Sequence, residues 1–412
     1  MTSSLEEFQL STKVTDINKW IFCDVKISRY LARNEKNLTL PSEDRAGKTV
    51  FFFHFITNFL KLCLIFLRQL SLPKKIKLDG INHLVLSSEA GHDKKNYLRH
   101  ISKEEDKFIT VKTFKTSSYM RIYTISFFNL IKFFFEAIKE INKVLSLKLP
   151  KELEVLVSKH IKTNLANYSY LCSIFLKIHS KHPNLIIYHS GATFLSSATK
   201  RIGISNRYLL HGLMGEAGKS SFPTYEKIFV YSKEEAEYLK KLTPESNVAL
   251  YPYKEIKNLE KKVLLFLRVD DHLMEKKQLD EVISYFTKNA YKVLFKLHPT
   301  YKGLLAKELS SAHSIKLSNN NNLDAKQVID EEKPSFSIGW ASTALCESLQ
   351  SGVIPITLLD KNSKKYNYVD APPIVYPIQK RCLSWQEERK EIDQLISNMS
   401  EYPNYLEILN SR

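Results

Sequence analysis

Glycine and proline are scarce in this chain, with 11 and 14 among 412 residues. Their scarcity excludes collagen-like, linker-rich and low-complexity architectures. Hydrophobic residues make up 43 % of the chain and charged residues 25 %, which is the balance of an ordinary folded protein. Because the chain is too long for one ordinary core, we expect two domains of about 150 to 250 residues each.

Cysteine is also rare, and its spacing excludes two kinds of cross-link. The number of cysteines is odd, and no two of them form a CxxC pair. We therefore expect neither a disulfide framework nor a structural zinc site, but reduced thiols packed in the core. The five cysteines are Cys23, Cys63, Cys172, Cys346 and Cys382.

Acidic residues are outnumbered: 44 Asp and Glu stand against 61 Lys and Arg, a formal net charge of +17. Such a surplus attracts polyanions, which include nucleic acid, anionic lipid, acidic glycans and phosphorylated donors. The basic residues are spread along the chain, with neither zinc-finger spacing nor an RNP-like aromatic motif. We therefore expect no nucleic-acid partner.

The sequence shows neither a signal peptide nor a membrane span, so we expect a cytoplasmic protein. The apolar run at residues 50–67 is interrupted by Asn58 and Lys61, and a lysine at the bilayer centre is costly. We expect a buried helix of the first domain there. The alternative is a helix lying on the inner membrane face, with Lys61 and Arg68 against anionic lipid. Residues 127–141 carry the same two interpretations.

Short β-branched runs alternate with helical segments over much of the chain, which is typical of parallel βα units. The pattern predicts two different Rossmann-like domains, at residues 1–250 and 251–412. In such open sheets, ligands bind at the carboxyl ends of the strands. The predicted strands cover residues 81–89, 108–114, 184–190, 207–212, 227–232, 263–269, 292–299, 314–318, 334–340 and 353–359.

The first candidate site follows a strand in YLLHGLMGEAG, residues 208–218. His211 stands at the strand end, and an imidazole with a pKa near neutrality is suited to be the general base for an acceptor hydroxyl. Glu216 is the alternative base, or the partner of the histidine. The other interpretation is a structural histidine in a tight turn.

The second candidate site is Lys296-Leu297-His298-Pro299, where Pro299 ends a strand. The imidazole of His298 can donate a hydrogen bond to the phosphate of a leaving nucleotide. The other interpretation is an ordinary strand exit.

The third candidate site begins at Gly339, the predicted end of a strand, and continues into a helix that starts at Ser342 or Thr343. Both are good N-cap residues, so an ordinary cap is one interpretation. A helix N-terminus with two hydroxyls is also suited to bind phosphate. Glu347, one turn along, is placed to reach a ribose hydroxyl.

A fourth, weaker group comprises His189 after one strand, and Arg268 with Asp270-Asp271-His272 after another. Either can line a cleft, although such residues are more often structural. The sequence has no paired DxD motif at a strand end, so we expect no metal and no other cofactor.

The order of these motifs resembles that of bacterial GT-B sialyltransferases and polysialyltransferases. It also looks like that of capsule and teichoic-acid polymerases and capsular Kdo transferases. The resemblance implies two Rossmann-like domains facing a cleft, with a C-terminal helix that can cross back. It also implies that His298-Pro299 and Ser342-Thr343 hold a CMP-linked donor. The chain departs from the pattern in having His211 where that family has an acidic base, and Thr343 in place of a second serine.

The resemblance implies a metal-independent inverting transfer of a sialic acid or Kdo-like sugar to a surface glycan, such as lipooligosaccharide or capsule. The partners would be the nucleotide-sugar donor, the acceptor glycan and the inner membrane face. One alternative is a CDP-polyol-dependent glycerol or ribitol phosphotransferase. The other is a non-catalytic protein that binds nucleotide or carbohydrate.

Overall fold

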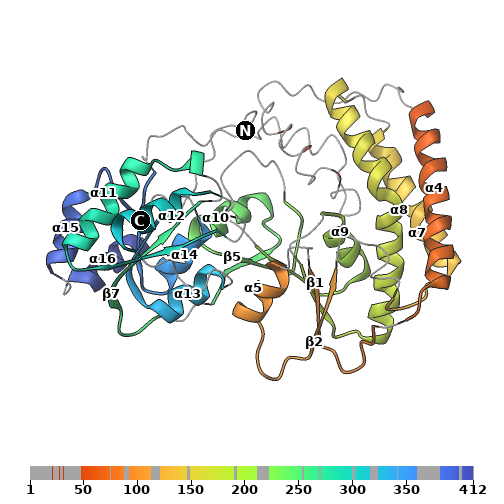
Figure 1. Cartoon of the computed structure of the whole chain (residues 1–412). Helices are drawn as coiled ribbons and strands as arrows, with labels where there is room; N and C mark the ends of the chain where they lie inside the picture. The colour runs from red at the N-terminus through yellow and green to blue at the C-terminus, as the bar shows by residue number, and fades with distance from the viewer. Residues whose placement is uncertain are drawn as a thin grey trace. The chain divides into compact units, whose positions relative to one another are not determined.

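The chain folds into two compact units in the computed structural model, shown in Figure 1. The first unit comprises Met1–His211, Ala217–Val230 and Ala236–Tyr251, and the second comprises Gly212–Glu216, Tyr231–Glu235 and Pro252–Arg412. The structure describes residues 21, 27, 31, 48–74, 76–87, 92–112, 121–145, 149–189, 193–210, 222–252, 255–268, 271–298, 301, 303–315, 323–340, 342–359, 381–398 and 401–411.

The first unit is built on a six-stranded parallel sheet with the order β2-β1-β3-β4-β5-β6. The strands are short and rich in β-branched and aromatic residues, and most of their side chains are buried, as in sheets covered on both faces. They are β1 (His83–Ser87), β2 (Phe108–Lys112), β3 (Ile186–His189), β4 (Asn206–Leu209), β5 (Lys227–Val230) and β6 (Asn247–Leu250).

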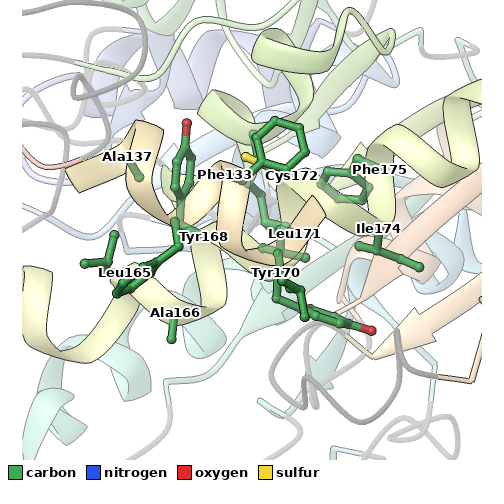
Figure 2. Close-up of a cluster of buried hydrophobic side chains, with 14 of the residues drawn as sticks. Phe133, Ala137, Leu165, Ala166, Tyr168, Tyr170, Leu171, Cys172, Ile174 and Phe175 are labelled. Atoms are coloured by element: carbon green, nitrogen blue, oxygen red, sulfur yellow. The ribbon is translucent and has the colours of Figure 1, made fainter. Parts of the chain in front are cut away.

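Helix α8 (Lys151–Lys181) is the central helix of the first unit. Almost every side chain from Leu165 to Phe175 is buried, and a helix that is apolar on all sides must have neighbours around it. Those neighbours include α4, α7 and α9. Figure 2 shows part of this core, in which Phe133 and Ala137 of α7 lie with Tyr168 and Cys172 of α8. The helices are α4 (Lys48–Ser71), α5 (His92–His100), α7 (Phe127–Leu145), α9 (Thr193–Ile202) and α10 (Lys233–Leu242).

The second unit has a five-stranded parallel sheet with the order β11-β10-β9-β7-β8. Its core is separate from that of the first unit and includes Phe286 and Phe336. The strands are β7 (Glu260–Phe266), β8 (Lys292–Lys296), β9 (Pro334–Gly339), β10 (Ile354–Thr357) and β11 (Leu383–Ser384). The helices are η2 (Asp271–Leu273), α11 (Lys276–Lys288), α12 (Leu305–His313), α13 (Ala325–Glu332), α14 (Thr343–Gln350), α15 (Arg389–Ser397) and α16 (Tyr402–Ser411).

The predicted class, an α/β protein with two Rossmann-like sheets, is confirmed. The C-terminal helices complete the second unit rather than crossing back, because α15 buries Ile392 and Leu395 in its core and α16 buries Tyr402 and Leu409 there. Strands β6 and β11 and helices α5 and α16 were not predicted. The strand predicted at residues 314–318 falls mostly outside the described residues, and Ser314 is the left-handed C-cap of α12.

The apolar run at residues 50–67 lies within α4, and the prediction of a buried helix is only half right. One side of α4 packs into the first unit, while Leu60, Leu64 and Leu67 are more than half exposed. Within the described part of the chain, no helix is both long and apolar enough to cross a membrane.

Three of the described thiols match the prediction of cysteines packed in the core. Cys172, Cys346 and Cys382 are buried, whereas Cys63 is partly exposed, and none of these four is part of a disulfide. Cys23 lies outside the described residues.

Candidate functional site

The carboxyl edge of the second sheet gathers residues from three strands. Phe266, the last residue of β7, pairs with Lys296 of β8, while its neighbour Leu265 pairs with Ile338 of β9. Lys296 and Gly339 therefore flank the end of β7 on opposite sides. From β7 the chain passes to β8 on one side of the sheet and then to β9 on the other side, so the strand order changes direction between β7 and β9. Ligands of open α/β sheets bind at such a switch point.

Helix α14 begins at this switch point. Ser342 is its N-cap, and the side-chain hydroxyl accepts a hydrogen bond of 3.2 Å from the Ala344 amide. Thr343 is the first helical residue, and both hydroxyl residues are partly exposed. Ser342 therefore orders the first turn, whose amides carry the positive end of the helix dipole.

Gly339 precedes this helix and is buried in the sheet. Its carbonyl accepts a hydrogen bond of 2.7 Å from the Leu358 amide, which carries the pairing beyond the end of β10. A Cβ at this position would stand 3.4 Å from the Phe266 Cβ and 3.9 Å from Leu345. Both are ordinary van der Waals contacts, so a side chain would fit at this position. The backbone hydrogen bond, and not the lack of a Cβ, is the structural contribution of Gly339.

Two charged side chains near this edge are almost fully buried. Lys296 is 4 % exposed, and its ammonium donates a hydrogen bond of 2.8 Å to the Leu297 carbonyl. Glu347, on the second turn of α14, is also 4 % exposed. Burying a charge is costly unless partners compensate, so both side chains need polar partners in the fold or in a ligand.

Arg268 and His298 follow the two neighbouring strands β7 and β8. Arg268 is partly exposed, and its amide donates to the Met274 sulfur at 3.4 Å. His298 is exposed, and its carbonyl accepts a hydrogen bond of 2.9 Å from the Tyr301 amide. Pro299 lies outside the described residues.

Asp271 joins the exits of β7 and β8, a role that the sequence did not reveal. Its Oδ1 accepts from the Tyr301 hydroxyl at 2.5 Å, and its Oδ2 accepts from the Leu304 and Leu305 amides at 2.7 and 3.1 Å. The Tyr301 oxygen in turn accepts from the Ala306 amide at 3.0 Å. Asp271 thus caps the start of α12 from another loop.

These bonds set the charge of Asp271. Burial opposes its ionisation, but the hydrogen bonds from Tyr301 and the two amides outweigh burial and hold the pKa of Asp271 below its ordinary value. Burial and the bond to Asp271 raise the pKa of Tyr301 to about 12. At neutral pH the pair is therefore a carboxylate and a neutral phenol.

One sequence signal for this cap was available. Helix α12 begins after Gly303-Leu304, and Leu304 has no side chain able to cap it. Such a start needs a cap from elsewhere in the fold. Gly303 leaves the room for it, because a Cβ there would lie 1.9 Å from the Asp271 Oδ1.

His211 and Glu216 lie outside the described residues, but Leu210, the residue before His211, is well anchored in the first unit. The Leu210 carbonyl accepts hydrogen bonds from the Asn96 amide group at 2.9 Å and from the Tyr251 hydroxyl at 2.8 Å. The Leu210 amide donates to the Phe229 carbonyl at 3.1 Å. The exit of β4 is therefore held from three directions.

His189, the other histidine at a strand end, is a core residue. It is fully buried, and its ring lies 5.2 Å from that of Tyr225 and 6.3 Å from that of Tyr208. Phe222 completes this aromatic cluster, in contact with both tyrosines. The structural interpretation of His189 is the one that this packing supports.

Among the residues that the structure describes, no three His, Cys, Asp or Glu side chains gather as a metal site requires. Asp271 and His272, which superficially suggest a site, belong to η2, where the Asp271 carboxylate binds Tyr301 and two amides.

Comparisons with known proteins show similarity of fold only. No protein-family model matches the chain, and no curated protein matches its sequence. Among solved structures, S. aureus MnaA with UDP matches at 11 % identity and a TM-score of 0.40, over 79 % of this chain and 91 % of that one. A glycosyltransferase of Rickettsia africae matches at 12 % identity and a TM-score of 0.42, over 80 % and 92 %.

A third similar structure is the UDP-GlcNAc 2-epimerase of Methanocaldococcus jannaschii in complex with UDP-GlcNAc and UDP. It matches at 11 % identity and a TM-score of 0.31, over 82 % of this chain and 93 % of that one. At this level of similarity, none of the three identifies the donor or the acceptor of this chain.

Proposed function

We propose that the protein is a glycosyltransferase that uses a nucleotide-linked sugar and binds the donor at the carboxyl edge of the second sheet. The observation that carries the proposal is that Lys296 ends β8, Arg268 follows β7 and α14 begins after β9, and these three strands are neighbours in one parallel sheet. Two cationic side chains and a helix N-terminus suit a phosphate. They can stabilise the negative charge that grows on a departing nucleotide.

The reaction is an inverting displacement. The acceptor hydroxyl oxygen attacks the anomeric carbon, and its proton passes to the base. The bond between that carbon and the nucleotide oxygen breaks, and the nucleotide leaves with the electron pair. His298 and the Ser342-Thr343 turn assist the leaving phosphate, Glu347 binds a ribose hydroxyl, and Gly339 and Pro299 shape the two strand exits.

His211 is the proposed base, with Glu216 as the second candidate. The support comes from Leu210, whose carbonyl is held by Asn96 and Tyr251. A base must be held within hydrogen-bond reach of the proton that it removes. Leu210, anchored in this way, is the last described residue before the proposed base.

The donor that we propose is a CMP-linked sugar of the sialic acid or Kdo type, and the acceptor is a bacterial surface glycan. The sequence order Lys296-x-His298-Pro299, followed by Ser342-Thr343, supports this choice. The positive net charge suits an anionic acceptor. An acceptor carried on lipid would bring the enzyme to the inner membrane face.

Nucleotide release tests the proposal. The full chain is incubated with CMP-sialic acid, CMP-Kdo, CDP-glycerol or UDP-GlcNAc, together with a deacylated lipooligosaccharide mixture, and the released nucleotide is measured by ion-exchange chromatography. We expect CMP release from a CMP-sugar, and a higher melting temperature with CMP.

The other outcomes would contradict all or part of the proposal. Release of UDP alone would show that the donor is a UDP-sugar and not a CMP-sugar. Release of CMP from CDP-glycerol alone would show that the protein transfers a polyol phosphate and not a sugar. Binding without release would indicate a non-catalytic protein, and no response to any nucleotide would refute the proposal.

Two variants test the base. His211→Ala should abolish transfer and keep the stabilisation by CMP, because the base does not hold the nucleotide. Glu216→Gln should retain most of the transfer. The opposite result for the two variants would make Glu216 the base.

A further inference from the structure

Helix α4 exposes a row of large apolar side chains to solvent and buries two polar ones. Its solvent-facing side carries Ile56, Leu60, Leu64, Leu67 and Leu70, which are 37, 57, 66, 60 and 59 % exposed. These residues recur at intervals of three or four and so lie on one face. The buried side carries Asn58 and Gln69, which are 1 % and 0 % exposed, together with the core residues Leu62 and Ile65. An ordinary surface helix exposes polar residues instead of a row of leucines.

Specific hydrogen bonds hold α4 in this orientation. Asn58 accepts from the Ala166 amide of α8 at 3.2 Å, and Lys61 donates to the Thr163 carbonyl at 2.8 Å. Turning the leucines inward would break these bonds and leave polar groups without their partners, which is costly.

Gln69 holds the other end of α4. It donates to the Ile125 carbonyl at 2.9 Å and accepts from the Ile125 amide at 3.0 Å. Lys61 and Gln69 thus both face protein, and of the two basic residues predicted to meet lipid, only Arg68 is exposed. The exposed leucines are a fixed feature of the fold.

Helix α7 lies alongside α4 and runs antiparallel to it, as two ring contacts indicate. Phe66 lies 5.0 Å from Phe127, and Phe55 lies 6.1 Å from Phe135. Figure 1 shows α4, in orange, as an outer helix beside α7 and α8.

The exposed side of α7 alternates aromatic and basic residues. Phe128 and Phe135 are 76 % and 51 % exposed, and Lys132 and Lys139 are exposed between and beyond them. We call the two exposed sides together the α4–α7 face. Its residues are Ile56, Leu60, Leu64, Leu67, Arg68, Leu70, Phe127, Phe128, Lys132, Phe135 and Lys139.

The charge of this face is of one sign. Helix α4 contains no Asp or Glu. The two acidic residues of α7, Glu136 and Glu140, are only partly exposed, and Glu136 pairs with Arg201. A symmetric dimer through this face would bring like charges together without acidic partners on the face. An anionic surface supplies the opposite charge.

We propose that the α4–α7 face docks on an anionic lipid bilayer. The leucines and phenylalanines enter the boundary between head groups and acyl chains, and Arg68, Lys132 and Lys139 bind lipid phosphates. The helices lie flat, because α4 is tied to α8 along its inner side. This docking does not depend on the proposed sugar transfer, and it would act in the same way for any reaction at a membrane.

Sedimentation with vesicles tests the proposal on the full chain. Vesicles of phosphatidylethanolamine and phosphatidylglycerol are compared with phosphatidylcholine vesicles. We expect binding to the anionic vesicles, at least ten-fold weaker binding to the neutral ones, and weaker binding at high salt. Lys132→Ala and Lys139→Ala should each reduce the partition coefficient about five-fold.

A matched pair of variants tests the apolar part. Leu64→Glu lies on the face, and Ile408→Glu replaces a 45 % exposed residue of α16 with the same change of charge. Both positions are exposed, so both variants should melt like the parent protein. Leu64→Glu should bind anionic vesicles at least ten-fold more weakly, and Ile408→Glu should bind nearly as the parent does.

Three results would overturn the proposal. They are a parent protein that does not bind anionic vesicles, equal losses in the two glutamate variants, and a parent dimer that Leu64→Glu converts to a monomer. The last result, seen by light scattering, would assign the face to a second copy of the chain. Nucleotide release by Leu64→Glu with the deacylated acceptor should equal that of the parent, so failure of docking and failure of transfer are distinguishable.

Discussion

At the residue scale, Asp271 shows how one carboxylate can order a candidate site without touching a ligand. It holds Tyr301 and the first amides of α12, and the Tyr301 amide in turn holds the His298 carbonyl. The loop after β8 is therefore tied to the loop after β7. We regard Asp271 as a positioning residue for the proposed donor site.

Replacing Asp271 should affect both stability and donor binding. Asp271→Ala removes the cap of α12 and should lower the free energy of unfolding in urea by about 1 to 2 kcal/mol. Asp324→Ala is the matched control, because Asp324 caps α13 by accepting from the Gln327 amide at 3.0 Å. Both variants should lose similar stability, but only Asp271→Ala should raise the KM for the donor. If the two variants have the same KM for the donor, Asp271 does not position the donor site.

The Asp271 carboxylate should also make stability depend on pH. Its pKa in the folded protein lies below the unfolded value of about 3.9. The carboxylate therefore stabilises the fold above that value, and the contribution is lost as the pH falls through the folded-state pKa. The difference in the free energy of unfolding in urea between the parent and Asp271→Asn should be largest at pH 6 and should decrease towards pH 3. A difference that grows on acidification would contradict this assignment.

At the element scale, the N-terminus of α14 combines a structural and a proposed chemical role. Ser342 caps the helix through its side-chain oxygen, and the same turn carries the dipole that the proposed donor phosphate would meet. Asparagine and aspartate cap helices about as well as serine. The two roles can therefore be separated by substitution.

Ser342→Asn and Ser342→Asp should both keep the parent stability to within about 1 kcal/mol, because both retain the cap. Only aspartate places a negative charge where the donor phosphate would bind. Ser342→Asp should raise the donor KM more than ten-fold, while Ser342→Asn should change it only a few-fold. Steady-state kinetics and thermal melts measure the two effects. An equal donor KM in both variants would show that the donor phosphate does not bind at this turn.

At the scale of the whole molecule, two separate cores allow the two units to unfold separately. Phe175 is fully buried in the first core and Phe286 in the second. Phe175→Ala and Phe286→Ala should each cost about 3 to 5 kcal/mol in its own unit. In calorimetry, CMP should raise only the transition that Phe286→Ala lowers. Stabilisation of the other transition would place the nucleotide in the first unit.

The sequence alone was enough to predict most strands of both sheets, because a β-branched run between turn residues is a local signal. Strand β11 has only two residues, too few for any periodic pattern, and β6, Asn247–Leu250, has a single β-branched residue, Val248. The capping role of Ser342 was also predictable, since it needs only neighbouring residues.

Contacts between distant residues were decided by the tertiary structure. The cap of α12 comes from Asp271, which lies 33 residues before Leu304, so inspection of the helix sequence does not reveal it. The orientation of α4 is a second example. The helix has apolar residues on nearly all sides, so its composition does not tell which side is buried. Asn58 and Gln69 select that side only once Ala166 and Ile125 are placed opposite them, because a buried polar group needs a partner that the fold must bring to it.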